Sequence, residues 1–246
     1  MKRLLRTPPT KLRALPRPDA AQRVAGEDAV WNAPFIGLVI FTFAIVTVRY
    51  PVAEIGIGVA ALGLLMTTNR FRVPAFIWWF FGYLAWALLV SFLSDYFDSA
   101  IVPLQERFKL LLIMIVAVNA LRTPAQLRTY CVLFLLFFLI YPFRGAITNY
   151  LIGNTVFGRA IWNNIYSNPN DLAALSIFAL GIALSLGIPG TQHRKRRVFY
   201  LTAAVLLAVL ILLTQSRGAF LGAMIGIAWP LSRAIWRSRT DRKSVV

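Results

Sequence analysis

The sequence has few residues that could hold a metal ion or form a disulfide. Its 246 residues include one cysteine, Cys131, and one histidine, His193. One cysteine cannot form an internal disulfide, and one cysteine with one histidine cannot supply the ligand set of a zinc site. Walker-type loops, GxSxG elbows and HExxH motifs are also absent from the sequence, so hydrolysis of nucleotides and serine- or metal-dependent hydrolysis have no sequence support. We expect neither a metal nor a cofactor.

Acidic residues are scarce as well. The chain has 9 Asp and Glu against 26 Lys and Arg, and its formal net charge is +17. Hydrophobic residues make up 59% of the chain and mean hydropathy is +0.68, whereas soluble domains are about 45–50% apolar. The basic residues lie in short runs between apolar segments, which argues against nucleic-acid binding. The composition predicts an all-α fold, a polytopic integral membrane helix bundle.

About eight apolar segments are near the length that crosses a bilayer. They are residues 34–48, 52–68, 74–93, 108–121, 129–143, 170–188, 198–214 and 218–236. This pattern divides the chain into four regions. They are a disordered basic tail (1–30), the first five spans (31–143), an outer loop with the last three spans (144–236) and a second basic tail (237–246).

The distribution of basic residues predicts the orientation of the chain. If the N-terminus is cytoplasmic, only six of the 26 Lys and Arg residues lie in outer segments, which leaves 20 on the inner side. Membrane insertion favours this arrangement, and an even number of spans also returns the C-terminus to the cytoplasm. Because cations on the outer side run against this bias, they are candidate ligands for an anion. The six are Arg49, Arg107, Lys109, Arg144, Arg159 and Arg217.

The longest outer segment, 144–169, reads RGAITNYLIGNTVFGRAIWNNIYSNP and predicts a loop, since it is rich in Gly, Asn and aromatic residues. Arg144 and Arg159 lie in this segment, and Arg217 opens the last span. A guanidinium can hold two phosphate oxygens at once, so Arg159 and Arg217 could clamp a diphosphate, with Arg144 as a third cation. The alternative is that these arginines only extend toward the membrane interface.

Two groups of polar residues lie near outer cations in the sequence. In the segment NPND, Asn168 and Asn170 flank Pro169, and Asp171 follows. These residues could cap the next helix, or Asp171 could act as a catalytic base. We group Asn168, Asn170 and Ser216 with the site as supporting residues. Glu106, at another outer boundary, predicts a local ion pair with Arg107 or Lys109.

The runs GRAIWNNIYSNPNDLAAL and LLTQSRGAFLGA, separated by two spans and a basic loop, resemble the O-antigen ligase and O-antigen polymerase superfamily of the bacterial inner membrane. The stretch PFRGAITNYLIG also resembles the exosortase-associated O-glycosylation ligases of that superfamily. The resemblance implies transfer of a glycan from undecaprenyl diphosphate to a lipid or protein acceptor at the outer face, in cell-surface polysaccharide, lipopolysaccharide or O-glycan biosynthesis. It also implies that Arg159 and Arg217 hold the diphosphate.

Members of that superfamily usually continue into a large outer loop that supplies a histidine thought to act as the base. This sequence stops at Val246, and its histidine is predicted on the inner side. We therefore expect either a shortened product or a partner polypeptide that completes the site. Three functions stay open: a membrane glycosyltransferase, a catalytically incomplete binding or assembly subunit, and an anion or lipid transporter. The transporter is disfavoured because the predicted span centres, such as LLIMIVAV, are almost wholly apolar.

Overall fold

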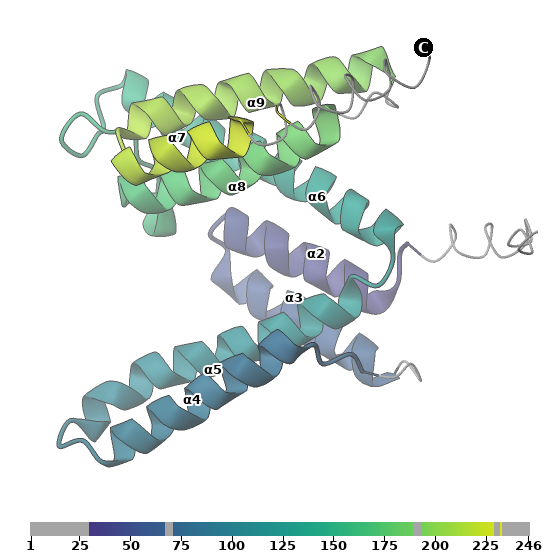
Figure 1. Cartoon of the computed structure of the whole chain (residues 1–246), viewed down its shortest axis with the longest axis vertical. Helices are drawn as coiled ribbons and strands as arrows, with labels where there is room; N and C mark the ends of the chain where they lie inside the picture. The colour runs from purple at the N-terminus through teal and green to yellow at the C-terminus, as the bar shows by residue number, and fades with distance from the viewer. Residues whose placement is uncertain (1–29, 67–70, 189–192, 229–231, 233–246) are drawn as a thin grey trace, which may run out of the picture.

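The structure, a computed structural model, describes residues 30–66, 71–188, 193–228 and 232, and these form a helical bundle (Figure 1). Except for Val30, the two predicted basic tails lie outside the described residues. No strand occurs in the described ranges, so the all-α class is confirmed. The helices are α2 (Ala33–Val46), α3 (Tyr50–Met66), α4 (Ala75–Phe92), α5 (Phe97–Ala120), α6 (Pro124–Phe138), α7 (Arg144–Leu151), α8 (Pro169–Gly187), α9 (Arg194–Thr214) and a last helix, Arg217–Ala228.

Four of the described helical segments are long and apolar enough to cross a membrane. They are α4, the continuous segment Pro124–Leu151, α8 and α9. Three further apolar helices are shorter: α2, the apolar part of α3 (Pro51–Met66), and the last helix. The chain therefore has the architecture of a helical membrane protein.

Two predicted boundaries are wrong. The span predicted at 108–121 is the second half of α5, which begins at Phe97 and has 24 residues. Its first half carries the charged residues Asp98, Glu106 and Arg107, and hydropathy excluded it for that reason. The predicted loop 144–169 begins with eight residues of helix, α7. Pro142 lies inside a π-helical turn (Leu139–Phe143) that joins α6 to α7, and this wider turn carries the helix past a proline that lacks a backbone N–H.

Helices α2 and α3 approach each other closely through small residues. A Cβ at Gly37 would collide with the backbone of Ala60 and Gly56, and a Cβ at Gly56 would collide with the backbone of Phe41. Such close contact through small residues is a common way for membrane helices to pack, because lipid provides no hydrophobic driving force between them.

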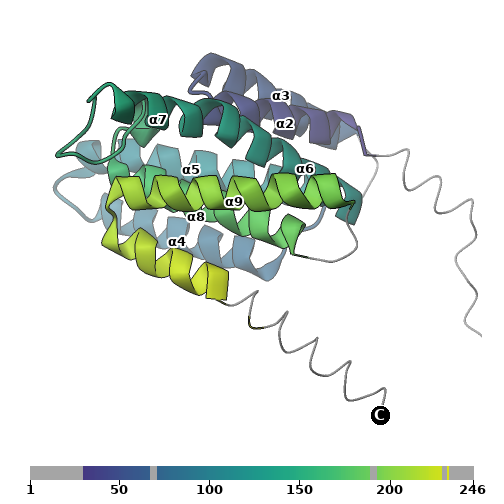
Figure 2. The same cartoon turned by 90° about the horizontal axis from the view of Figure 1, so that it is seen from above.

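The largest buried cluster lies among α6, α8 and α9, which run alongside one another (Figure 2). It includes Phe138, Leu172, Leu180, Leu207 and Leu210, all nearly inaccessible to solvent. The α4–α5 hairpin lies at the opposite side of the bundle (Figure 1) and has a separate small core. The loop between α7 and α8 therefore belongs to the better-packed half of the molecule.

Candidate functional site

The candidate site forms where α9 ends. Gln215 adopts a left-handed conformation (φ 52°) and terminates α9, which leaves its last carbonyl groups without helical partners. The loop before α8 supplies donors for them. The Ala160 N–H donates to the Leu213 carbonyl at 2.9 Å, and Arg159 Nε donates to the Thr214 carbonyl at 2.7 Å. A cation at this end also interacts favourably with the helix dipole.

Arg159 reaches a second helix through the same guanidinium. Its Nη2 donates to Asn170 Oδ1 at 2.7 Å, in the first turn of α8. One half-buried side chain thus joins the end of α9 to the start of α8. Both acceptors are neutral oxygens, so the positive charge of Arg159 is not compensated by either contact.

A tight turn positions Arg159. Val156 and Arg159 exchange two backbone hydrogen bonds, at 3.0 and 3.2 Å. The two central residues, Phe157 and Gly158, have φ of 53° and 74°, as the hairpin turn called type I′ requires. The turn directs the Phe157 ring into solvent (96% exposed).

Two aromatic residues anchor the rest of the loop. Tyr166 is buried (1% exposed), lies 6.2 Å from Phe138 between ring centroids, and its hydroxyl donates to the Val46 carbonyl at 3.5 Å. Its carbonyl accepts from the Trp162 N–H. Trp162 in turn covers Gly145, where a Cβ would collide with the indole. The loop is thereby held against α2, the end of α6 and α7.

The start of α8 matches the capping interpretation of NPND. Asn168 is the N-cap and its Oδ1 accepts the Asn170 N–H at 2.9 Å, while Pro169 occupies the first turn. Asp171 lies exposed in that turn, next to Asn170. Its carboxylate is accessible and one residue away from the partner of Arg159.

Arg217 and Arg144 lie at this same end but are less constrained. Arg217 begins the last helix directly after Ser216, whose carbonyl accepts the Phe220 N–H. It lines an open groove of about 410 Å³ with Leu212, Phe220 and Leu221. Arg144 begins α7, beside the glycine that Trp162 covers. Both side chains are exposed, and within the described ranges neither forms an ion pair.

The structure thus connects Arg159, Asn168 and Asn170 by hydrogen bonds and places Ser216 and Arg217 immediately after the α9 terminus. His193 precedes α9 at its other end. The 21 residues of α9, about 30 Å of helix, separate it from the candidate site. In the part of the chain that the structure describes, no group of three His, Cys, Asp or Glu residues could hold a metal ion.

The predicted ion pair of Glu106 is confirmed, with Lys109 Nζ 2.8 Å from Glu106 Oε1. It lies inside α5 rather than at its boundary, and both side chains are largely exposed. Together with Glu54 and Arg107 they line a separate cavity of about 770 Å³ against α2 and α3.

Sequence reasoning missed the residues that shape the loop. Trp162, Tyr166 and Gln215 were not singled out, and neither was Asn149, whose Nδ2 donates to the Ile161 carbonyl at 3.3 Å. The two aromatic residues lie in an otherwise polar segment, which was the available signal. The left-handed conformation of Gln215 gives no sequence signal, because a glycine would be the usual residue there.

Comparisons with known proteins give no relative: the chain matches no family model, no curated protein and no solved structure. The resemblance to O-antigen ligases therefore depends on the quoted residues alone.

Proposed function

We propose that this protein is a membrane glycosyltransferase of the O-antigen ligase type that binds an undecaprenyl-diphosphate glycan at the end of α9. The observation that carries the proposal is the presence of two uncompensated arginines near this terminus. Arg159 is held between α8 and α9, and Arg217 opens the next helix three residues after the Thr214 carbonyl that Arg159 contacts. Guanidinium groups are suited to diphosphate oxygens.

The groove beside Arg217 supports a lipid-linked substrate rather than a soluble one. Leu212, Phe220 and Leu221 give it an apolar surface, and Arg217 adds a cation to its lining. A diphosphate next to Arg217 would allow the first isoprene units of the carrier to lie along these side chains. The substrate would then reach the site from the membrane.

In the proposed reaction, an acceptor hydroxyl attacks the anomeric carbon of the glycan. The new carbon–oxygen bond replaces the bond to the diphosphate, which leaves with the electron pair. Arg159 and Arg217 stabilise the negative charge that develops on the leaving group, and the substrate is positioned by the loop and the groove. The hydroxyl proton needs a base, for which the candidate is Asp171, exposed in the first turn of α8 beside Asn170.

A second function, a binding or assembly subunit without catalysis, is favoured by the position of His193 at the far end of α9. Because His193 cannot reach the arginines, the exposed Asp171 is the remaining candidate for the base. The two functions share the binding site and differ in whether the glycan is transferred.

We further propose that the eight predicted spans cross the inner (cytoplasmic) membrane of a bacterium, with both termini in the cytoplasm. The distribution of Lys and Arg supports this orientation. The shorter helices, such as the 14-residue α2, would require local thinning of the bilayer.

A transfer assay with a matched control tests the proposed function. The purified chain in liposomes is mixed with undecaprenyl diphosphate carrying one labelled sugar and with a hydroxyl-bearing glycolipid acceptor, and release of free undecaprenyl diphosphate is followed. Release by wild type and Arg107→Ala, but not by Arg217→Ala, supports a glycosyltransferase. Arg107 is a suitable control because it lines the other cavity.

Binding without release would identify the non-catalytic subunit. Absence of binding by the wild-type protein would contradict both functions and return the anion transporter as the leading hypothesis. If release persists in Arg217→Ala, the arginine cluster is not the diphosphate site.

A further inference from the structure

A second cationic cavity, separate from the candidate site, lies at the opposite end of α9. It has a volume of about 530 Å³ and is formed by residues within 128–133 of α6 and 195–200 of α9. Three cations line it: Arg128 from α6, and Lys195 and Arg196 from α9. The cavity is thus built by two helices that are far apart in the sequence, not by a single basic run.

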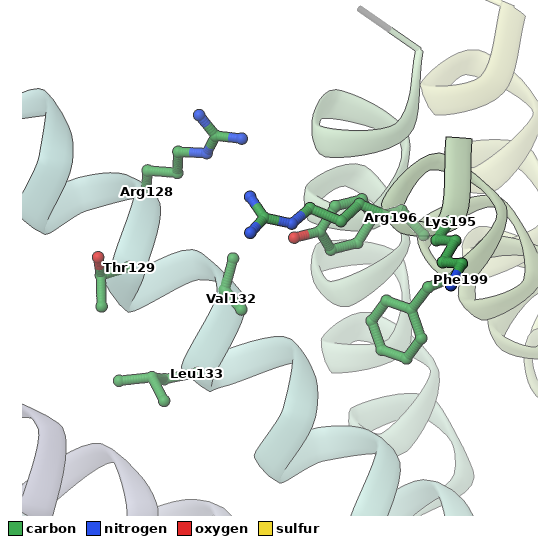
Figure 3. Close-up of a pocket in the computed structure, with 8 residues that line it drawn as sticks. Arg128, Thr129, Val132, Leu133, Lys195, Arg196 and Phe199 are labelled. Carbon is green, nitrogen blue, oxygen red and sulfur yellow. The ribbon is translucent and has the colours of Figure 1, made fainter. Parts of the chain in front are cut away.

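The two arginines face each other across the cavity. Figure 3 shows the guanidinium groups of Arg128 and Arg196 directed toward one another from the two helices. Among the described residues, no acidic side chain lines the cavity. The described acidic residues are Glu54, Asp95, Asp98, Glu106 and Asp171, and none belongs to α6 or α9. Facing like charges repel, so an anion between them would be stabilising.

Apart from Thr129 and Tyr200, the rest of the cavity lining is apolar. Val132 and Leu133 lie on α6 one turn further along, and Phe199 lies on the α9 side of the cavity (Figure 3). The cavity therefore has a cationic rim and an apolar wall directed along the helices. A free phosphate would satisfy the rim alone, whereas a phospholipid would satisfy the rim and the wall.

We propose that this cavity is a binding site for an anionic phospholipid. Its phosphate lies between Arg128 and Arg196, Lys195 adds positive charge beside it, and the upper part of an acyl chain lies along Val132 and Phe199. Basic pockets between membrane helices bind anionic headgroups in this way. The inference does not depend on the diphosphate site, since it uses different residues at the other end of the bundle.

The test compares lipid adducts on the intact, detergent-purified protein by native mass spectrometry. Phosphatidylglycerol and phosphatidylcholine with identical acyl chains are the probes. We expect phosphatidylglycerol to bind about tenfold more tightly, and Arg128→Ala/Arg196→Ala to remove that preference. The control Arg194→Ala/Arg197→Ala loses the same charge from residues that do not line the cavity. This control should keep the preference for phosphatidylglycerol.

Equal binding of the two lipids, or equal loss of the preference in both double variants, would overturn the proposal. Displacement of the lipid by millimolar inorganic phosphate would also overturn it, because the site would then recognise free phosphate. All four arginines are exposed on helices, where alanine is well tolerated. Retention of the wild-type elution volume and circular dichroism confirms that each variant is folded.

Discussion

Arg159 and Arg217 carry the same charge but are held differently. The Arg159 guanidinium donates hydrogen bonds to Thr214 and Asn170, while Arg217 is exposed at the start of a helix. Substitution of Arg159 therefore removes a structural link as well as a cation. Substitution of Arg217 removes the cation with little else, which makes it the cleaner probe of ligand binding.

We predict that Arg159→Ala lowers the free energy of unfolding by about 1–2 kcal/mol, because two hydrogen bonds to a charged group are lost. Arg217→Ala should change it by less than about 0.5 kcal/mol, as is usual for exposed positions. Thermal unfolding in detergent, compared with Asn170→Ala, checks both values. Equal destabilisation by Arg159→Ala and Arg217→Ala would contradict the structural role of Arg159.

The sequence predicted the arginines of the site but not their contacts. Arg159 and Arg217 were identified because outer cations oppose the insertion bias, which needs only the order of spans. The bonds of Arg159 depend on the turn at Phe157 and Gly158 and on the left-handed Gln215. Those backbone conformations are set by packing of the loop, which hydropathy does not describe.

At the scale of elements, the loop between α7 and α8 depends on the indole that covers Gly145. Gly145→Val should displace Trp162 and loosen the loop, because the valine side chain and the indole would occupy the same space. We expect faster limited proteolysis between residues 152 and 158 than in the wild type. A cleavage rate equal to the wild-type rate would show that Trp162 does not anchor the loop.

The α2–α3 contact gives a second prediction with a control inside the same helix. Gly56→Leu should destabilise the protein by about 1–3 kcal/mol, the usual cost of overpacking, because a Cβ there meets the backbone of Phe41. Gly58→Leu should be nearly neutral, since nothing lies within 4 Å of its Cβ position. Thermal unfolding compares them, and equal melting temperatures would contradict the close approach.

The sequence predicted the positions of the apolar helices better than the residues at which helices begin and end. Uniformly apolar segments such as α4 and α8 were located to within a few residues, because hydropathy alone defines them. The first half of α5 was missed since its charges interrupt the apolar run, and α7 was missed since the Gly, Asn and aromatic content of 144–169 was interpreted as a loop. Charged residues limit an apolar span but are good helix formers, so hydropathy gives the end of a span rather than the end of a helix.

At the scale of the whole molecule, the proposed orientation places the loop 152–168 and His193 on opposite sides of the membrane. In a Cys131→Ser background, we predict that Asn154→Cys reacts with a membrane-impermeant maleimide added to the outside of spheroplasts. His193→Cys should react only after the membrane is permeabilised. The reverse pattern would place the candidate site in the cytoplasm and exclude an outer-face glycosyltransferase.

The central claim, that the end of α9 binds a lipid diphosphate, is tested most directly by comparing the affinities of the purified protein for undecaprenyl diphosphate and undecaprenyl monophosphate. We predict that the wild-type protein prefers the diphosphate by about tenfold, equivalent to about 1.4 kcal/mol, because the additional phosphate gives the arginines more oxygens to contact. In Arg217→Ala the ratio of the affinities for the diphosphate and the monophosphate should fall close to one. Equal affinity of the wild-type protein for the two lipids would contradict the claim.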